Sequence, residues 1–295
     1  MKILSNKISL GTAKLGIDGY GFSSNPLPDD KTKFLEKSYR AGIKSIDTSP
    51  RYGNAEKIIG GFINNINSNP LISSKIDGLK HNNHQSPRIM IESVKRSINR
   101  MNISKLDVCY LHQNDLNIIS DPYIQEGLFA LKEMNLIGYC GTSVYSFEEL
   151  DYTVLSGLYD FIQVPVNILD TSYYDRIVDY KSEIKIAARS IFLQGILFNN
   201  KTIQKKIKYN KLLLQSLQKL ETLCRSFGVE LSSVCIAYIN ELEMIDQIII
   251  GTSSIDNLKA NIDSTRYLLD KNLSKMIGDL ASGSKSWTNP RSWNK

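Results

Sequence analysis

Four side chains that can carry charge or exchange a proton lie at or just beyond the ends of short apolar runs. Asp47 ends the first of these runs, and Tyr52 follows it within five residues, in a loop that turns at Pro50. Lys75 and His112 each end a later run. Such runs predict buried strands, and the loop after a strand often carries chemistry because the strand holds it rigidly. We therefore expect one site that contains all four side chains.

The chemistry that these residue types support is proton transfer to a carbonyl oxygen. A phenol has a pKa near ~10, and a neighbouring cation lowers it, so we expect Lys75 to lower the pKa of Tyr52. Asp47 is the counter-ion that can keep a buried lysine charged, and His112 can donate a hydrogen bond to the carbonyl oxygen. Taken singly, each residue could instead be a loop cap, a packing residue or a surface charge, so the hypothesis depends on the four together.

The elements that must position these residues alternate between strand-like and helix-like along the whole chain. Continuous apolar strands separated by helices predict a parallel sheet that is buried on both faces, and eight such units predict an α/β fold of the (β/α)8 TIM-barrel type. A doubly wound sheet would need a G-x-G-x-x-G turn, which Gly16, Gly19 and Gly21 do not form. The expected strands cover residues 8–16 (with the following loop), 42–47, 71–75, 106–112, 137–143, 161–166, 184–189 and 247–251, and the expected helices cover residues 29–41, 54–65, 89–101, 124–134, 147–156, 212–227, 232–241 and 254–265.

Length and composition predict one domain over residues 1–295, with a tail from about residue 271 that lies over or beside the barrel. No linker-like segment interrupts the chain, residues 1–7 lack the apolar core of a signal peptide, and no apolar run approaches the ~20 residues of a membrane span. We therefore expect a soluble cytoplasmic protein without a membrane partner. Four unpaired cysteines are expected to be reduced packing residues: Cys109, Cys140, Cys224 and Cys235.

Two polar segments have alternative interpretations. His81 and His84 could form a metal pair, but no third ligand type lies nearby in the sequence, and we favour a solvated loop without a metal. The basic run over residues 201–211 could follow nucleic acid, but we favour a solvated face or a cover near cofactor phosphates. The net charge of +6 is modest and spread out, so no nucleic-acid partner is expected.

The segment from Asp47 to Tyr52, followed by Lys75 and His112 on the next two predicted strands, resembles the signature of the aldo-keto reductases, in a bacterial-type member. The resemblance implies a TIM barrel that is an NAD(P)(H)-dependent carbonyl reductase or alcohol dehydrogenase. It implies that hydride moves from nicotinamide C4 to a carbonyl carbon while Tyr52 gives the proton, or the reverse. The implied partner is a small carbonyl or alcohol, and the implied cofactor is NADP, with NAD possible.

The resemblance also carries over cofactor-binding positions. Three of them depart from the family pattern: Val144 replaces an asparagine beside Ser143, Arg189 replaces the aromatic residue that stacks on nicotinamide, and Asn257 replaces an arginine that binds the 2′-phosphate. The charge of Arg189 opposes the oxidised ring, so either Phe192 takes the stacking role or the cofactor balance shifts. The full implied set is Thr12, Lys14, Asp47, Ser143, Gln163, Arg189, Gly251, Thr252, Ser253, Ser254, Asn257 and Asn261, and Asn167 lies just beyond the sixth strand.

The expected substrate is a polyhydroxylated carbonyl, a sugar or sugar derivative. Ala13 leaves open a wall that many family members close with an aromatic side chain, and polar side chains surround the predicted site. Two alternatives remain: a cofactor-binding regulatory barrel with negligible turnover, and a hydrolase or aldolase that uses Lys75 as a Schiff base. The expected polar rim is Arg51, Gln113, Asn114, Asp115 and Arg189, and Trp287 and Trp293 either fold over the mouth or pin the tail.

Overall fold

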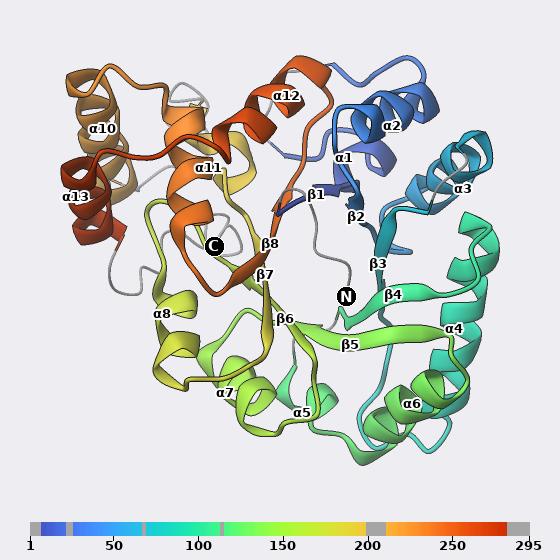
Figure 1. Cartoon of the computed structure of the whole chain (residues 1–295). Coiled ribbons are helices and arrows are strands. Elements are labelled where there is room, and N and C mark those ends of the chain that lie inside the picture. The colour runs from blue at the N-terminus through green and yellow to red at the C-terminus, as the bar shows by residue number, and fades with distance from the viewer. Residues whose placement is uncertain (1–6, 22–25, 67–68, 113–114, 199–210, 282–295) are drawn as a thin grey trace.

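Eight parallel strands close into a barrel in sequence order in the computed structural model of the chain (Figure 1). The structure describes residues 7–21, 26–66, 69–112, 115–198 and 211–281. Each strand pairs with the next, and β8 closes on β1, so the predicted TIM barrel is confirmed. The strands are β1 (Ile8–Gly11), β2 (Ser45–Asp47), β3 (Leu71–Ile76), β4 (Leu106–Leu111), β5 (Ile137–Ser143), β6 (Phe161–Pro165), β7 (Lys185–Arg189) and β8 (Ile245–Ile250).

The helices lie outside the strands, and every predicted helix is present within three residues at each end. Several elements differ from the prediction, among them helices over residues 116–119, 193–198 and 271–281 that were not predicted. The first strand stops at Gly11 and a one-turn helix follows it, and a helix between β6 and β7 was missed because it buries only Ser172 and Ile177. The helices are α1 (Ala13–Gly16), α2 (Lys31–Arg40), α3 (Ala55–Asn65), α4 (Ser86–Met101), α5 (Leu116–Ile119), α6 (Pro122–Glu133), α7 (Phe147–Leu155), α8 (Ser172–Asp179), η1 (Leu193–Phe198), α10 (Lys211–Ser226), α11 (Leu231–Glu241), α12 (Ile255–Ser264) and α13 (Lys271–Ala281).

Local capping explains where several helices begin. A capping box begins α7: Ser146 Oγ accepts from the Glu149 backbone, and the Glu149 carboxylate accepts from the Ser146 backbone. Asp30 caps α2 in the same way by accepting from Lys33 N at 2.9 Å. These bonds satisfy amide groups that the first turn of a helix leaves unpaired.

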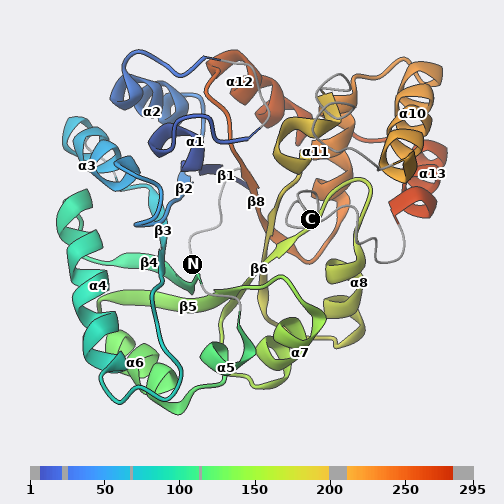
Figure 2. The ribbon, with the colours of Figure 1, turned by 180° about the vertical axis from the view of Figure 1, so that it is seen from behind.

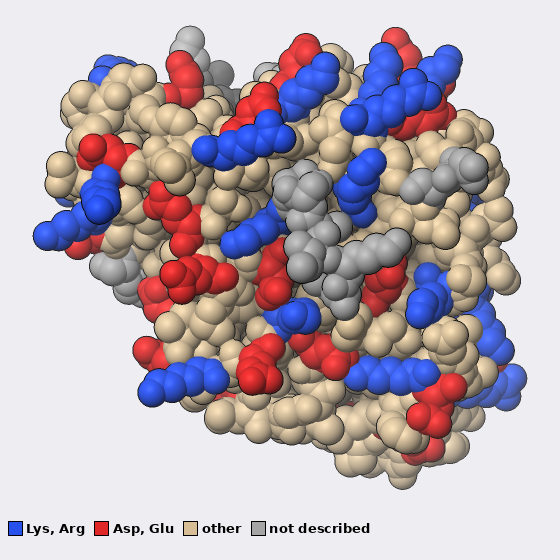
Figure 3. All heavy atoms as spheres, in the orientation of Figure 1, with Lys and Arg blue, Asp and Glu red and all other residues tan. Residues whose placement is uncertain are grey.

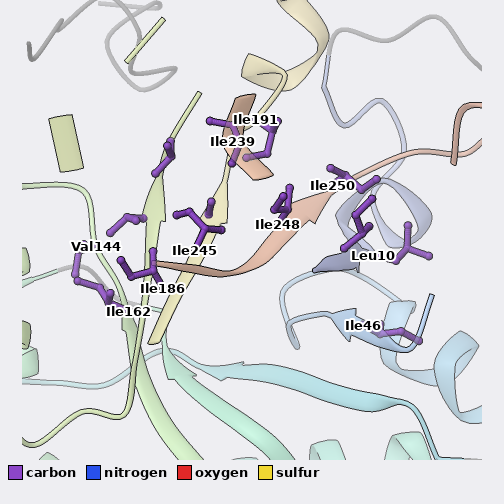
Figure 4. Packing of buried hydrophobic residues seen from close by; sticks show 14 of the residues in the cluster. Leu10, Ile46, Val144, Ile162, Ile186, Ile191, Ile239, Ile245, Ile248 and Ile250 are labelled. Carbon is purple, nitrogen blue, oxygen red and sulfur yellow. The ribbon is translucent and has the colours of Figure 1, made fainter. Parts of the chain in front are cut away.

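The apolar core has two parts. The larger part fills the space between the strands and the outer helices, and Figure 4 shows Ile186, Ile245 and Ile239 within it. The smaller part lies around Val108, Tyr110, Phe161 and Ala187, all of which belong to strands. Side chains of neighbouring strands that point inward fill a TIM barrel, so this smaller cluster is the floor under the mouth of the barrel.

The tail of the described chain lies beside the barrel. The two views in Figures 1 and 2 agree that α13 lies against α10, outside α11. Thr171 N donates to Ala281 O at 3.3 Å, which ties the end of α13 to the start of α8. Residues 282–295, with Trp287 and Trp293, lie outside the described residues, so the position predicted for them stays a prediction.

Surface and cysteine features agree with the composition. All four cysteines are buried and free, as predicted. Figure 3 shows lysine and arginine interspersed with aspartate and glutamate on one face, without a large field of one sign. Within the described ranges no single helix is long and apolar enough to cross a membrane, although α10 and α11 pass that test together across a bend of 95°.

Candidate active site

A buried ion pair joins the ends of β2 and β3. Lys75 Nζ donates to Asp47 Oδ1 at 2.7 Å, to Asp47 Oδ2 at 2.8 Å and to Thr48 O at 2.8 Å. Lys75 is 2% exposed and Asp47 4% exposed. Three acceptors therefore surround the three protons of an ammonium group, which stabilises its charge away from water. An amine held in this way is a poor nucleophile, so the geometry disfavours the Schiff-base alternative.

Close backbone packing fixes the loop that carries Tyr52. A Cβ atom on Gly16 would lie 1.7 Å from Tyr52 O, and one on Gly53 would lie 2.2 Å from Gly16 O. Gly53 also has a φ of 53°, which favours glycine. Two glycines thus let α1 approach the loop and place the phenol ring with its centroid 5.4 Å from Lys75 Nζ.

The electrostatics of Tyr52 differ from the prediction. Burial and the Asp47 carboxylate raise the pKa of Tyr52 well above its ordinary value of 10.0, and Arg189 is the cation that opposes this increase. The expected lowering by Lys75 was wrong because Asp47 neutralises that charge at contact distance. The phenol therefore keeps its proton throughout the neutral range.

His112 follows β4 directly and lies beside Tyr52. The two rings are perpendicular, with centroids 6.1 Å apart. Ser49 Oγ lies 3.2 Å from His112 Nδ1, and Asp77 Oδ2 lies 3.8 Å from the same atom. Asp77 also forms an ion pair with Arg51. These contacts orient the imidazole from its Nδ1 edge.

A chain of hydrogen bonds connects the Asp47–Lys75 ion pair to β5 and β6. Gln163 Nε2 donates to Asp47 Oδ1 at 3.0 Å, and Ser143 Oγ donates to Gln163 Oε1 at 3.2 Å. Both side chains are buried. The structure therefore connects two predicted cofactor residues to Asp47, one of the four predicted catalytic residues.

Arg189 ends β7 next to this chain of hydrogen bonds. Its Nη2 donates to Val144 O at 2.7 Å, and its Cζ lies 3.8 Å from the centroid of the Tyr145 ring. Its Nε is buried and has no hydrogen-bond partner among the described residues. Phe192, the alternative stacking residue, instead packs against Phe198 with ring centroids 5.2 Å apart.

The predicted phosphate-binding segment lies where β8 leads into α12. Ser254 caps the helix by accepting from Asn257 N at 3.2 Å, and Thr252 Oγ1 accepts from Ser254 N at 3.1 Å. Ser253 Oγ is buried without a partner among the described residues. Gly251 and the Asn257 side chain are exposed, whereas Asn261 is buried.

These residues fit a nicotinamide dinucleotide. A buried hydroxyl at a helix N-terminus suits a phosphate oxygen, since the amide groups of the first turn also point towards an anion. A planar guanidinium with an unused Nε–H suits a flat ring that carries an amide. The unpaired Ser253 Oγ and Arg189 Nε are thus both explained by a ligand of this kind.

The first-strand positions have structural partners. Thr12 donates through both N and Oγ1 to Asp47 O, at 3.0 and 3.1 Å, and so fixes the β2 strand end. Burial lowers the pKa of the half-buried Lys14. Asn167 holds a tight turn, because its Oδ1 accepts from Leu169 N at 2.9 Å. Ala13 is buried in α1.

One residue of the predicted polar rim binds the backbone instead of facing the site. Asp115 caps α5 by accepting from Asn117 N at 2.9 Å, so its carboxylate is used by the backbone.

His81 Nδ1 lies 3.0 Å from Asp121 Oδ2, and the described residues contain no group of metal-ligand side chains. Gln113 and Asn114, and the basic residues 201–210, lie outside the described residues.

Sequence reasoning missed four neighbours of the site. Ser49 lies two residues after Asp47, so its proximity was available from the sequence. The proximity of Asp77 and Tyr145 to the site could not be predicted, because only the closed barrel brings the strand ends together. Tyr20 is 42% exposed and interacts electrostatically with Tyr52 and Tyr145. No sequence pattern distinguishes this tyrosine from the fourteen others.

Comparison with known proteins identifies the family. The model of the aldo/keto reductase family matches residues 7–281. The chain belongs to this family. It is therefore an NAD(P)(H)-dependent oxidoreductase, of a family that acts on small carbonyl compounds with NADP(H).

Two curated relatives are sugar dehydrogenases by name. An L-galactose dehydrogenase from Arabidopsis thaliana is 23% identical over 285 residues, which cover 88% of each chain. A D-arabinose 1-dehydrogenase from Saccharomyces cerevisiae is 25% identical over 264 residues, which cover 82% of this chain and 77% of the relative.

Solved structures share the fold at low identity. A glycerol dehydrogenase from Gluconobacter oxydans gives a TM-score of 0.73 at 19% identity and covers 93% of this chain and 90% of its own. An aldo-keto reductase from Bombyx mori, solved in complex with NADP, gives a TM-score of 0.70 at 15% identity. The match covers 93% of this chain and 89% of the other.

Proposed function

We propose that this aldo/keto reductase reduces the carbonyl group of a sugar or sugar derivative with NADPH, and oxidises the corresponding alcohol in the reverse direction. The observation that carries the proposal is a cluster at one end of the barrel, in which Lys75 of the Asp47–Lys75 pair lies near the Tyr52 ring and that ring lies beside His112. A buried phenol, a fixed ammonium group and an oriented imidazole are the groups that proton transfer to a carbonyl oxygen requires.

The chain supplies the proton and the orientation. The bound cofactor supplies the hydride, which adds to the carbonyl carbon. Tyr52 donates its proton to the carbonyl oxygen, and solvent later returns a proton to the phenol. His112 donates a hydrogen bond to the same oxygen and positions it. The phenol is protonated at neutral pH, as the acid in the direction of reduction must be, while burial and Asp47 raise its pKa and thereby make it a weaker donor.

The cofactor is held at both ends of the proposed site. Ser143 and Gln163 are the groups assigned to the nicotinamide carboxamide, and their connection to Asp47 links that end to the catalytic pair. Ser253 and the N-terminus of α12 are assigned to the adenosine phosphate. We expect NADP to be preferred, and NAD to be accepted, because the neutral Asn257 stands at the expected 2′-phosphate position.

The choice of a sugar has two supports. The curated relatives are named as dehydrogenases of galactose and arabinose. The surroundings of the phenol are polar, with the Arg51–Asp77 pair near His112 and the partly exposed Tyr20 near Tyr52. A polar pocket rejects an apolar ligand because each unpaired buried group costs about 1–3 kcal/mol.

A substrate panel followed by nicotinamide absorbance tests the proposal. Aldoses, keto-sugars and nucleotide sugars should exceed matched aromatic aldehydes in kcat/KM, once the intrinsic reactivity of each carbonyl is allowed for. Higher values for bulky apolar ketones would contradict the sugar assignment. Oxidation of bound NADPH by a small reactive aldehyde in a single turnover separates an enzyme from a regulatory barrel, in which the cofactor would stay reduced.

A further inference from the structure

Two cations at the mouth of the barrel are bound by carboxylates, and Arg189 is not. Lys75 binds Asp47, and Arg51 forms an ion pair with Asp77. Arg189 has no carboxylate partner among the described residues, because its guanidinium is held by neutral groups only. A charge fixed without a counter-ion acts on whatever binds beside it.

The position of Arg189 is fixed by three neighbours. Val144 O accepts from Nη2 at 2.7 Å, Ser190 Oγ lies 3.4 Å from Nη1, and the Tyr145 ring covers one face of the guanidinium. The backbone turns away immediately after the strand, since Ser190 has a φ of 63°. The guanidinium is therefore held over the tyrosine ring, and the side chain stays at the strand end.

This arrangement places the charge beside the groups assigned to the nicotinamide carboxamide. Val144, which binds Arg189, follows Ser143 directly, and Ser143 binds Gln163. Arg189 also pairs with Pro165 in the β6–β7 register, two residues beyond Gln163. A ring whose carboxamide binds Ser143 and Gln163 thus lies within reach of the guanidinium. Phe192 does not compete for this place because it packs against Phe198.

We propose that Arg189, stacked on Tyr145, is the platform for the nicotinamide ring and that its fixed positive charge makes the protein bind the reduced cofactor in preference to the oxidised one. The inference rests on the proposed function. A planar guanidinium can stack on either form of the ring. Only the oxidised ring carries a positive charge, so only that form is repelled. Such a preference loads the site with NADPH and promotes release of NADP⁺ after the reaction, while it makes hydride donation by the bound cofactor thermodynamically less favourable.

Equilibrium binding tests the inference without turnover. The dissociation constants of NADPH and NADP⁺ are measured by fluorescence titration for the parent, Arg189→Gln, Arg189→Lys and the control Arg88→Gln, which removes an exposed arginine of α4. We expect the parent to bind NADPH at least about tenfold more tightly than NADP⁺. Arg189→Gln should reduce this ratio at least about fivefold, mainly through tighter NADP⁺ binding. Arg189→Lys should keep most of the ratio of the two dissociation constants while weakening the binding of both cofactor forms. The control Arg88→Gln should leave both dissociation constants unchanged.

The NADH and NAD⁺ pair provides an internal comparison. The ratio of the NAD⁺ and NADH dissociation constants should change with Arg189→Gln by the same factor, because the 2′-phosphate binds elsewhere in the proposed site. A ratio that Arg189→Gln leaves unchanged overturns the inference while the proposed function stands. A parent that binds none of the four nucleotides overturns the proposed function, and the inference with it.

Discussion

The two halves of the barrel mouth handle charge differently. At the ends of β2 to β4, each cation of the site is bound by a carboxylate, as in Lys75 with Asp47 and Arg51 with Asp77. At the ends of β7 and β8, the described residues leave the charge of Arg189 without a carboxylate and the hydroxyl of Ser253 without a partner. The first half balances its charges within the fold, although Thr48 Oγ1 has no hydrogen-bond partner among the described residues, and the second half leaves one charge unbalanced. A paired group fixes geometry, whereas an unpaired group provides binding energy.

Removing the phenol should have the largest effect. We expect Tyr52→Phe to lower kcat by ~10²–10⁴-fold, because the hydroxyl is the proton donor. The dissociation constant of NADPH should change by less than about twofold, since the cofactor groups lie in the other half of the mouth. Stopped-flow reduction and fluorescence titration measure the two quantities. A variant that keeps half of the parent rate would show that Tyr52 is not the acid.

Breaking the buried Asp47–Lys75 ion pair should destabilise the first half of the barrel mouth. Lys75→Met leaves Asp47 buried without its cation, which should lower the free energy of unfolding by about 3–5 kcal/mol. Adding Asp47→Asn should restore most of that stability, because no buried charge remains, but it should not restore turnover. Urea unfolding and steady-state rates are compared across the two variants. Equal stability of the single and double variants would contradict the pairing argument.

Displacing the loop of Tyr52 should have an intermediate effect. Gly16→Ala places a methyl group against Tyr52 O, so we expect a loss of about 1–3 kcal/mol in stability together with a lower kcat. Gly61→Ala is the matched control, since a Cβ atom there meets its nearest neighbour at 3.6 Å. Thermal unfolding and kcat measure the outcome. If the two variants behave alike, close packing at Gly16 does not position the phenol.

Adding a charge to the second half should have the smallest effect. Asn257→Arg places a cation at the start of α12, where the exposed Asn257 uses its backbone N–H to donate to Ser254 Oγ. A hydrogen bond to a charged group contributes about 1.5–3 kcal/mol, so the preference for NADP over NAD should rise by roughly tenfold or more. The kcat/KM values with the two cofactors measure this preference. Improved use of NAD would place the 2′-phosphate elsewhere.

Local sequence was sufficient for most of the fold. The strand β5 matches the prediction residue for residue and α7 begins at the predicted residue, because an apolar run and a helix cap are properties of neighbouring residues. The short helices α1 and α8 were missed or misassigned, because a four-residue helix and one with two buried residues lack a periodic stripe. The single domain over residues 1–295 and the placement of the tail beyond residue 281 stay predictions.

The types and order of the predicted catalytic residues could be obtained from the sequence. Asp47 ends β2, Lys75 lies one residue before the end of β3, and His112 lies one residue after β4. Parallel strands present their carboxyl ends at one mouth, so a sequence that places reactive side chains at successive strand ends determines a shared location. The roles assigned to these residues stay proposals that the experiments above address.

The tertiary structure alone decided the electrostatics. The pKa of Tyr52 rises because the fold excludes water from the phenol and brings Asp47 close, and Arg189 acquires its neighbours only when β5 and β7 stand in one barrel. Gly16 is needed because a loop more than thirty residues away packs on its backbone. Coulomb interactions and desolvation depend on distances of a few ångströms, and the spacing of residues along a chain does not specify such distances between distant segments.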